Sequence, residues 1–342
     1  LGDGMADRPI ESLGGRTPLE YAKTPKMDEL AAKGEIGMVH TIPDGMKPGS
    51  DTANLSVLGY NPREFYSGRS PLEALSIGVP MKDTDVALRC NIVTLSEEED
   101  NYEDRTIIDH SSGEISTEEC AVLLEAVKKE LETDIFHFYV GTSYRHCLIW
   151  ENGEVVDLVQ PHDVLGQKIG DKLPENEALR TMMKKSYNIL VNHPINIERK
   201  KKGLNPANSC RFWGAGTKPA LYPFTERTHK KGAMISAVDL LKGIAVGTSM
   251  KVITVDGANG GLDTNYEGKA KAALDVLTRD GYDFVYVHLE GPDEMGHQGS
   301  VEKKVKAIER LDERIIRPIA EGLAAAGEDF RMVVLPDHPT PI

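Results

Sequence analysis

The chain has 342 residues, 27% of them charged and 40% hydrophobic, and a formal net charge of −14. This length predicts about two domains with a sizeable core. The acidic net charge argues against nucleic acid as a partner. The absence of a long apolar run and of a signal-peptide pattern argues against a membrane protein. The four cysteines lie far apart without Cys-x-x-Cys spacing, which favours a reducing cytoplasm over a disulfide framework.

The first half of the chain mixes helices with an apparent hairpin. Apolar spacing, caps and turn residues predict, in chain order, helices over residues 15–34 and 51–59, a strand over 86–95, a helix over 117–132, hairpin strands over 136–140 and 146–150, and a helix in the second half of 171–191. The basic run at residues 198–203 is expected to be exposed.

The second half alternates strands and helices. The patterns predict a helix over residues 231–243, a strand over 250–255, a helix over 266–279, a strand over 283–289, a helix over 301–326 and a strand over 330–335. Strands separated by helices form βαβ units, so we expect an α/β fold with a largely parallel sheet. The hairpin-rich middle predicts a second α/β domain, residues 85–228, inserted into a discontinuous domain made of residues 1–84 and 229–342.

Two apolar runs each end in a carboxylate and an imidazole. Asp337 and His338 follow one run, and Asp293 and His297 follow the other. Side chains at the carboxyl ends of strands in an open α/β sheet point into the crevice where such folds bind ligands. Carboxylate and imidazole together suit manganese, zinc and cobalt alike. The two runs therefore predict a metal site.

Two further polar residues extend this set, and each has a structural alternative. Asp3 lies between two glycines, where the backbone can approach a ligand and a carboxylate can face a cation; the alternative is a turn with an Asx-type hydrogen bond. Ser50 begins a predicted helix, where an anion such as a phosphoryl group is favoured; the alternative is an ordinary N-cap. A free hydroxyl is a poor nucleophile, and the chain has no Gly-x-Ser-x-Gly elbow, so Ser50 would need a metal ion.

In chain order these motifs resemble those of the alkaline phosphatase superfamily. They are Gly-Asp3-Gly-Met, Gly-Ser50-Asp-Thr-Ala-Asn, Asp293-Glu-Met-Gly-His297 and Pro-Asp337-His338. Within that superfamily, four segments resemble the archaeal-type cofactor-independent phosphoglycerate mutases: Gly-Arg69-Ser-Pro-Leu-Glu-Ala, Arg89-Cys-Asn91, Tyr144-Arg145-His146 and residues 235–244. The resemblance covers essentially the whole chain. It implies an alkaline-phosphatase-like, mostly parallel sheet flanked by helices, with the smaller α/β domain inserted.

The resemblance implies two divalent ions, manganese or magnesium with zinc or cobalt as alternatives, and no bisphosphoglycerate. One ion would be held by Asp3, Ser50, Asp337 and His338. The other would be held by Asp293, His297 and a further His that such mutases carry shortly after the Asp-His-Pro-Thr segment. The printed sequence reaches Ile342 before that His, and it starts where a buried strand is expected to have just ended.

The implied reaction is the interconversion of 3-phosphoglycerate and 2-phosphoglycerate through a phosphoserine at Ser50. The discontinuous domain would bind the metal ions, and the inserted domain would bind this small phosphorylated substrate and close over it to keep water out. Because phosphoglycerate has two anionic groups, cationic side chains are the expected contacts, with polar partners for the hydroxyl groups. The candidates are Arg89, Asn91, Asp109, Arg145, His146, Lys218 and Lys231.

Two other functions stay open at this point. A phosphatase or phosphodiesterase of the same superfamily would use the same Ser50 and ions but pass the phosphoryl group to water. A chain without the further His would be a catalytically silent metal- or ligand-binding scaffold. The archaeal-type relatives suggest self-association, although no apolar stripe in this sequence demands it.

Overall fold

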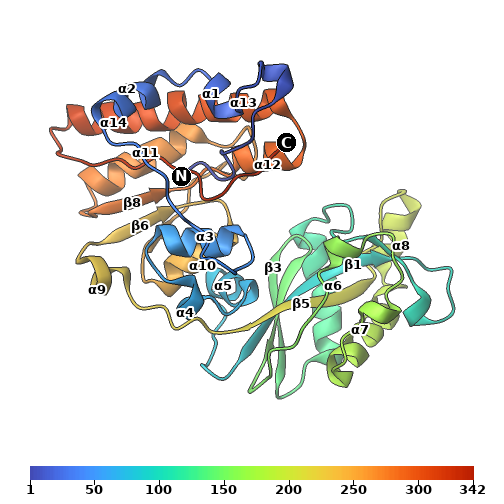
Figure 1. Ribbon diagram of the computed structural model, residues 1–342. Coiled ribbons are helices and arrows are strands. Elements are labelled where there is room, and N and C mark those ends of the chain that lie inside the picture. Colours follow the sequence, from blue (N-terminus) through green and yellow to red (C-terminus); the bar gives the residue numbers. More distant parts are fainter. The chain divides into compact units, whose positions relative to one another are not determined.

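The computed structural model describes residues 1–342, which divide into two compact units (Figure 1). Unit 1 comprises Leu1–Tyr66 and Ala220–Ile342, and unit 2 comprises Ser67–Pro219. These divisions lie earlier in the chain than the predicted boundaries at 84/85 and 228/229. None of the helices is both long enough and apolar enough to cross a membrane.

Unit 1 contains a three-stranded parallel sheet in the order β7-β6-β8. Its strands are β6 (Gly232–Ile235), β7 (Lys251–Ile253) and β8 (Phe284–Val287). Its helices are α1 (Pro18–Tyr21), α2 (Pro25–Lys33), α3 (Ser50–Val57), α4 (Pro62–Phe65), α9 (Phe224–Thr228), α10 (Asp239–Gly247), α11 (Tyr266–Thr278), α12 (Gly291–His297), α13 (Val301–Leu311) and α14 (Arg317–Ala325). A π-helical turn, Asp312–Ile316, joins α13 to α14.

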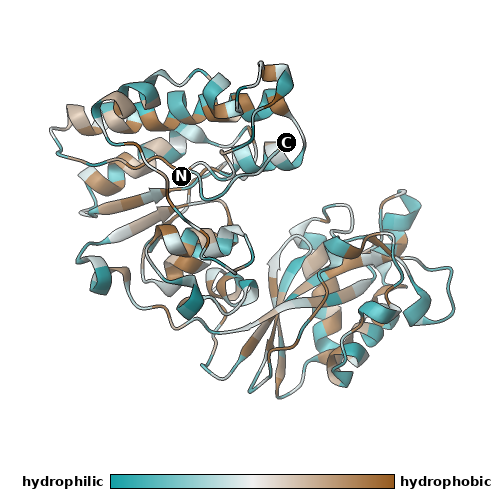
Figure 2. Ribbon diagram, in the orientation of Figure 1, coloured by the Kyte–Doolittle hydropathy of each residue, from teal (hydrophilic) through white to brown (hydrophobic).

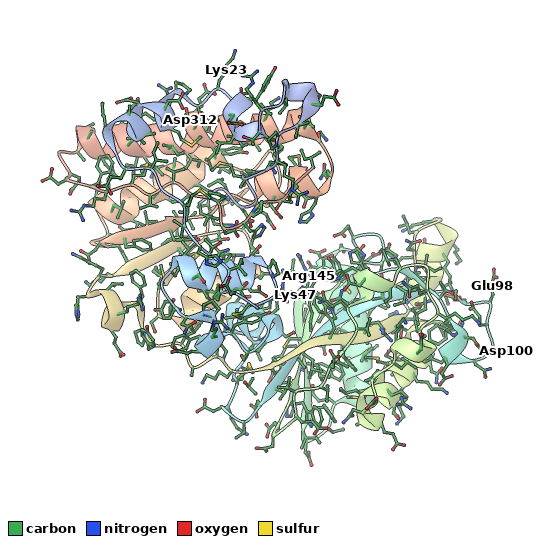
Figure 3. The ribbon with its side chains drawn as sticks, in the orientation of Figure 1. Lys23, Lys47, Glu98, Asp100, Arg145 and Asp312 are labelled. Carbon is green, nitrogen blue, oxygen red and sulfur yellow. The ribbon has the colours of Figure 1, made fainter.

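The core of unit 1 lies between the sheet and its long helices. Ala270 of α11, Ile308 of α13 and Leu323 of α14 belong to one buried apolar cluster with Ile235 of β6. Figure 2 shows α13 and α14 with hydrophobic and hydrophilic residues alternating along each helix, as expected for amphipathic helices that cover a core. The buried carboxylate of Asp312 (Figure 3) accepts hydrogen bonds from the first N–H groups of α2 and so holds that helix in place.

Three segments far apart in the sequence lie side by side at the carboxyl end of β8. Gly2 forms a parallel bridge with Leu289, and Leu289 N donates to Leu1 O at 3.0 Å. Gly2 N donates to Leu335 O at 3.1 Å. The fully buried ammonium of Lys304 donates to Thr340 O at 2.7 Å, which fixes the segment after residue 335. This arrangement brings the N-terminal and C-terminal motifs together.

Unit 2 contains a five-stranded antiparallel sheet in which β1 pairs with β2, β4 and β5, and β4 also pairs with β3. Its strands are β1 (Val86–Leu95), β2 (Ile107–Asp109), β3 (Phe136–Thr142), β4 (Arg145–Trp150) and β5 (Ser209–Thr217). Its helices are α5 (Arg69–Ser76), α6 (Thr117–Leu131), α7 (Glu177–Leu190) and α8 (Pro194–Lys201). The predicted strand at 86–95 and the predicted hairpin are confirmed.

Strand β1 is buried on both of its faces. Leu88 packs with Leu123 of α6 on one face, and Ala87 packs with Ala74 of α5 on the other. Because side chains alternate along a strand, Arg89 shares the face of Ala87 and points toward α5. Its guanidinium contacts that helix, as described below. The fold of unit 2 therefore places a buried arginine beneath α5.

The prediction of a helix over residues 231–243 is wrong. Gly232–Ile235 forms β6, and α10 begins only at Asp239. All four residues of β6 are buried, with β7 on one side and β8 on the other. A short apolar run cannot be assigned to helix or strand by periodicity alone. Its position between two other strands decides the outcome.

Three other expectations also need correction. The strand predicted over residues 330–335 does not form, because no neighbouring strand pairs along this segment, and Val333 is 75% exposed. The basic run at 198–203 lies partly in α8 and is not wholly exposed, since Arg199 is buried and donates to Ser112 O at 2.7 Å. The sheet is parallel only in unit 1, since the five strands of unit 2 pair antiparallel.

Candidate functional site

The acidic residues predicted to bind metal converge where the three segments of unit 1 meet. Asp3 N donates to Leu289 O at 2.9 Å, which places its side chain at the end of β8. Gly4 N donates to Asp337 Oδ1 at 3.2 Å and ties the N-terminal turn to the C-terminal segment. Asp293 lies in the first turn of α12. Contacts across most of the chain length thus assemble these carboxylates.

Asp3, Asp293 and His338 form the tightest group, which we call the Asp3–Asp293–His338 cluster. One ligand atom from each residue lies within 4.8 Å of the others. His338 Nε2 is 3.5 Å from Asp3 Oδ1 and 3.6 Å from Asp337 Oδ2. Ser50 Oγ, at the start of α3, lies 3.0 Å from the same nitrogen. The predicted nucleophile therefore lies at the edge of the cluster.

The ring of His338 is oriented by its neighbours. Its Nδ1 lies 3.2 Å from Pro339 O, and because a carbonyl oxygen can only accept, Nδ1 is the donor. Nε2 then faces Asp3. Burial by itself lowers the pKa of His338, but the negative charges of Asp337, Asp3 and Asp293 raise it above its ordinary value. The cluster consequently attracts positive charge.

Asp3 is buried and crowded by other carboxylates. Burial, followed by the charges of Asp337 and Asp293, raises the pKa of Asp3 well above its ordinary value. Its Oδ1 is buried and has no hydrogen-bond partner. A divalent cation would satisfy this oxygen and offset the carboxylate charges. The residues present therefore fit a metal ion.

The turn at Gly4 leaves no space for a side chain. Gly4 has φ +58°, and an added Cβ would lie 2.5 Å from Asp293 Oδ1 and 2.8 Å from Asp293 Cα. The Thr340 hydroxyl donates to the same Asp293 oxygen and lies 3.3 Å from His338 Nδ1. Glycine permits both the left-handed backbone and this close approach.

Asn54, one turn into α3, links Ser50 to Asp337. Its Nδ2 donates to Ser50 O at 2.8 Å and to Asp337 Oδ2 at 2.9 Å. Its Oδ1 accepts from Tyr286 OH at 2.5 Å. Asp337 also accepts from His338 N at 3.0 Å. Both oxygens of Asp337 thus already have protein donors, in contrast to Asp3 Oδ1.

His297 lies apart from the cluster at the end of α12. Its side chain is 68% exposed, and Nε2 is 3.3 Å from Asp293 Oδ2. The sequence analysis assigns Asp293 to the second ion together with His297. In the structure Asp293 lies near His297 and also within the Asp3–Asp293–His338 cluster. One carboxylate is therefore shared between the two predicted ion positions.

Among the predicted cationic substrate contacts, Arg89 of unit 2 is buried and held by protein contacts, whereas Arg145, Lys218 and Lys231 are exposed. Arg89 is 6% exposed, its Nη1 donates to Glu73 Oε1 at 3.0 Å, and its guanidinium lies 4.8 Å from the centre of the Trp213 ring. Burial lowers the pKa of Arg89, although Glu73 opposes that effect. Its Nε is buried without a partner. A buried guanidinium with a free donor is suited to an anionic ligand.

Asn91 and Asp109 are occupied by protein partners. Asn91 Oδ1 accepts from Trp213 Nε1 at 3.1 Å. Asp109 accepts from Ser111 N at 2.8 Å and from Asn205 Nδ2 at 2.8 Å. Burial raises the pKa of Asp109, but these hydrogen bonds outweigh it and lower the pKa below its ordinary value. Both side chains organise the loop after β2.

His146 is buried in β4 with both ring nitrogens in contact with protein atoms. Nδ1 accepts from Gly141 N at 3.0 Å, and Nε2 is 3.1 Å from Cys120 Sγ. Burial lowers the pKa of His146 to about 3. The residue is therefore neutral at physiological pH, and this geometry favours a structural role.

The remaining predicted contacts are exposed cations. Arg145 (Figure 3) lies beside Tyr144, with its guanidinium 5.4 Å from the ring centre. Lys218 Nζ is 3.6 Å from Asp83 Oδ1. Lys231 is exposed in unit 1, just before β6. Each of these side chains could turn toward a ligand without breaking a buried contact.

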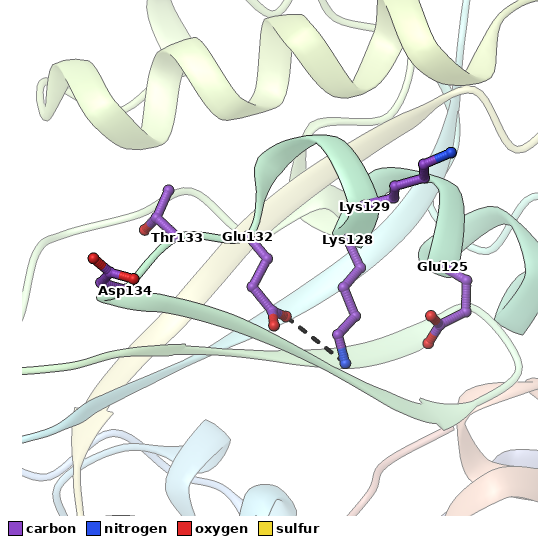
Figure 4. Close-up of a pocket in the computed structure, with 6 residues that line it drawn as sticks. All are labelled: Glu125, Lys128, Lys129, Glu132, Thr133 and Asp134. Atoms are coloured by element: carbon purple, nitrogen blue, oxygen red, sulfur yellow. Dashed lines mark ion pairs between the residues drawn. The ribbon is translucent and has the colours of Figure 1, made fainter.

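A surface hollow at the end of α6 contains none of the predicted residues (Figure 4). It is lined by Glu125, Lys128, Lys129, Glu132, Thr133 and Asp134. Lys128 of α6 and Glu132, the residue directly after that helix, form a 3.8 Å ion pair on the surface. Such solvated charge pairs are common on helix surfaces. The hollow is therefore a weaker candidate for the functional site than the Asp3–Asp293–His338 cluster.

The chain is similar to known proteins over its whole length. A family model described as 2,3-bisphosphoglycerate-independent phosphoglycerate mutase matches residues 31–196. A mutase of that name from Methanosarcina barkeri is 51% identical, with all of this chain and 85% of the relative covered. The chain belongs to this family of mutases. A protein from Geobacter sulfurreducens carrying the same description, qualified as probable, is 48% identical over all of this chain and 85% of its own length.

The chain is also similar to two solved structures, one of which is named as a mutase. A Pyrococcus horikoshii protein matches with a TM-score of 0.77 and 33% identity, covering all of this chain and 81% of its own. A cofactor-independent phosphoglycerate mutase from Thermoplasma acidophilum matches with a TM-score of 0.60 and 28% identity, covering 95% of this chain and 83% of its own. Both support the α/β architecture described above.

Two residues that organise the cluster in this mutase are missed by the sequence analysis. Asn54 holds Asp337, and His288 holds Asp3, with Nε2 3.0 Å from Asp3 Oδ2. Burial lowers the pKa of His288 to about 4. A histidine directly after an apolar strand and five residues before Asp293 is the pattern that could have identified it.

Proposed function

We propose that this chain interconverts 3-phosphoglycerate and 2-phosphoglycerate by passing the phosphoryl group through Ser50. Family membership supports the reaction, since the relatives are named as phosphoglycerate mutases, which are isomerases, and as independent of 2,3-bisphosphoglycerate. The observation that supports Ser50 is the 3.0 Å contact between its Oγ and His338 Nε2 at the edge of the Asp3–Asp293–His338 cluster.

The cluster would hold a divalent ion through Asp3, Asp293 and His338, with Asp337 beside them. His297, 3.3 Å from Asp293, is the candidate for a second ion. Carboxylate and imidazole ligands suit Mn²⁺, with Mg²⁺, Zn²⁺ and Co²⁺ as alternatives. Bound there, a divalent ion lowers the pKa of a hydroxyl and offsets the charge of a transferring phosphoryl group.

The reaction consists of two transfers at the same serine. In the first, the Ser50 Oγ–P bond forms while the bond from phosphorus to the C3 oxygen breaks, and the hydroxyl proton ends on that oxygen. Glycerate stays bound, its C2 hydroxyl oxygen then attacks phosphorus while the Ser50 Oγ–P bond breaks, and the C2 hydroxyl proton ends on Ser50 Oγ. The start of α3 favours the phosphoserine, because its N–H groups and dipole stabilise negative charge. Water must stay excluded between the transfers.

The two units would divide the work. Unit 1 would supply Ser50 and the metal ligands, and unit 2 would bind the substrate. Arg89 and Arg145 are the preferred contacts for carboxylate or phosphate, because a guanidinium can bind either in bidentate fashion. Lys218 and Lys231 are further candidates, whereas Asn91, Asp109 and His146 already have protein partners and are weaker ones.

Three wider features complete the proposal. The parallel order β7-β6-β8, with carboxylates beyond the carboxyl ends of the strands, supports a fold of the alkaline phosphatase superfamily with unit 2 as an insertion. The four buried free cysteines support a reducing, cytoplasmic location. Self-association follows only from the likeness to archaeal-type relatives, and size-exclusion chromatography tests it.

The deciding experiment is an enolase-coupled assay of 3-phosphoglycerate conversion, run beside a free-phosphate assay. Protein stripped with chelator is measured alone and after addition of Mn²⁺, Mg²⁺, Zn²⁺ or Co²⁺, without bisphosphoglycerate. Ser50→Ala should reduce kcat by at least about 1,000-fold, as loss of a nucleophile does elsewhere. Ser56→Ala makes the same change on the same helix away from the cluster and should keep full activity.

Each outcome has a distinct meaning. Metal-dependent isomerisation that disappears only in Ser50→Ala supports the proposal. Phosphate release without isomerisation would indicate a hydrolase. If the parent protein with added metal is inactive in both assays, the chain is a binding scaffold. If Ser50→Ala keeps full activity, Ser50 is not the nucleophile.

A further inference from the structure

His288 lies directly after β8 in the interior of unit 1, and its ring contacts Asp3 of the Asp3–Asp293–His338 cluster. It is fully buried, with Nε2 3.0 Å from Asp3 Oδ2 and Nδ1 3.2 Å from Ser236 Oγ. Its backbone is fixed as well, since His288 N donates to Ile235 O at 2.9 Å and Lys269 Nζ donates to His288 O at 3.0 Å. The ring therefore has a single defined position.

The hydrogen bonds assign the protons of this ring. An ionised Asp3 can only accept, so Nε2 of His288 is the donor. Ser236 Oγ already accepts from Val238 N at 3.0 Å, and its own hydroxyl proton is free to point at Nδ1. With the Ser236 proton directed at Nδ1, the chain from Val238 through Ser236 and His288 to Asp3 has one donor and one acceptor at each step, and the imidazole is neutral.

A neutral donor has a specific effect on Asp3. It holds Oδ2 in place without cancelling the negative charge of the carboxylate. The other oxygen, Oδ1, has no hydrogen-bond partner and lies at ion-pair distance, 3.5 Å, from His338 Nε2. A charged donor at the same place would instead compete with a cation for that carboxylate.

We propose that His288 is a positioning residue that fixes the Asp3 carboxylate so that Oδ1 is presented to the metal ion. The inference rests on the metal site proposed above. Histidine, serine and carboxylate contacts behind a metal ligand set the orientation of that ligand, and their loss weakens metal binding by about 10- to 100-fold. His288 touches neither substrate nor the reacting atoms in this role.

The test is Mn²⁺ binding to chelator-stripped full-length protein, measured from the electron paramagnetic resonance signal of free Mn²⁺. His288→Leu should weaken the Mn²⁺ dissociation constant by about 10- to 100-fold. His288→Gln keeps an N–H donor directed at Asp3 and should stay within about fivefold of the parent. At saturating Mn²⁺ the KM for 3-phosphoglycerate should be unchanged in both variants.

A matched control distinguishes a specific effect on Mn²⁺ binding from a general loss of folding stability. Thr248→Val removes a fully buried hydroxyl that donates to Ile244 O at 2.7 Å at the end of α10, away from the cluster. It should lower the melting temperature and leave Mn²⁺ affinity unchanged. Unchanged affinity in folded His288→Leu would overturn the proposal, as would a loss of affinity in His288→Gln equal to that in His288→Leu.

Two further variants cover the other outcomes. If His288→Leu does not fold, Ser236→Ala is the test variant, because without the serine hydroxyl the His288 proton can move from Nε2 to Nδ1. A roughly three- to tenfold weaker Mn²⁺ binding in Ser236→Ala supports the positioning role of His288. Unchanged Mn²⁺ binding overturns it. Asp293→Asn tests the metal site itself. If this variant binds Mn²⁺ as tightly as the parent, the metal site fails, and the inference about His288 fails with it.

Discussion

Replacing Gly4 by alanine tests how closely the N-terminal turn must approach Asp293. Gly4 has φ +58°, where alanine costs about 1–2 kcal/mol of folding free energy. The added Cβ would also lie 2.5 Å from Asp293 Oδ1 and 2.8 Å from Asp293 Cα, whereas real Cβ contacts essentially never fall below 3.0 Å. To reach 3.0 Å from the added Cβ, Asp293 Oδ1 must move by about 0.5 Å and Asp293 Cα by about 0.2 Å.

That displacement sets the expected loss of activity. Rotation of the Asp293 side chain cannot relieve the contact with its Cα, and rotation that relieves the Oδ1 contact still displaces that oxygen. A 1 Å misplacement in an active site can cost about 100-fold in rate. A shift of about half that size should reduce kcat by roughly tenfold or more.

Gly14→Ala is the matched control. Gly14 has φ +68° in the same unit, but nothing lies within 4 Å of an added Cβ. Both variants should lose about 1–2 kcal/mol in urea unfolding from backbone strain, with a further loss for Gly4→Ala from the steric contact. Only Gly4→Ala should lose kcat in the enolase-coupled assay at saturating Mn²⁺. Equal kcat in the two variants would refute the idea that this close approach shapes the cluster.

Three further predictions concern other parts of the molecule. Asn54→Leu should lower the free energy of unfolding by about 1–3 kcal/mol in urea titrations, because Asp337 and Tyr286 lose a buried partner; an unchanged midpoint would contradict this. Arg89→Lys should raise the KM for 3-phosphoglycerate by about tenfold, because an ammonium cannot bind an anion in bidentate fashion, and an unchanged KM would remove Arg89 from the substrate set. His146 has its pKa lowered from 6.5 to about 3 in the folded chain. The unfolded chain therefore binds an extra proton between those values, and stability should fall by about 1.4 kcal/mol per pH unit as pH decreases through this window. His146→Gln should lack this slope, so an unaltered slope in denaturation at pH 5 and 6 would argue against a buried neutral imidazole.

Local patterns located many of the elements. The strand predicted at 86–95 matches β1, and the helix predicted at 117–132 matches α6, Thr117–Leu131, whose cap is Ser116. These segments carry their own period, cap and stop residues, so neighbours in sequence were enough. The region 231–243 has no comparable period, cap or stop residue at its start. Its first apolar residues form a strand because β7 and β8 lie on either side of them.

The candidate site divides in the same way. Residue type and spacing marked Asp3, Ser50, Asp293 and His338, since each lies in a short motif that carries its own chemistry. His288 could have been noticed from its place directly after an apolar strand, but its partner could not be predicted, because the contact with Asp3 spans 285 positions in the sequence.

Side-chain chemistry and local periodicity, which can be read from the sequence, identified the residue types that could bind metal and phosphate and located several helices and strands, but they failed for β6 and for the unpaired segment 330–335. Only the tertiary structure decided which carboxylate oxygens have protein donors and which one, Asp3 Oδ1, has none. That distinction depends on contacts between segments hundreds of residues apart, and the packing of the whole unit sets them.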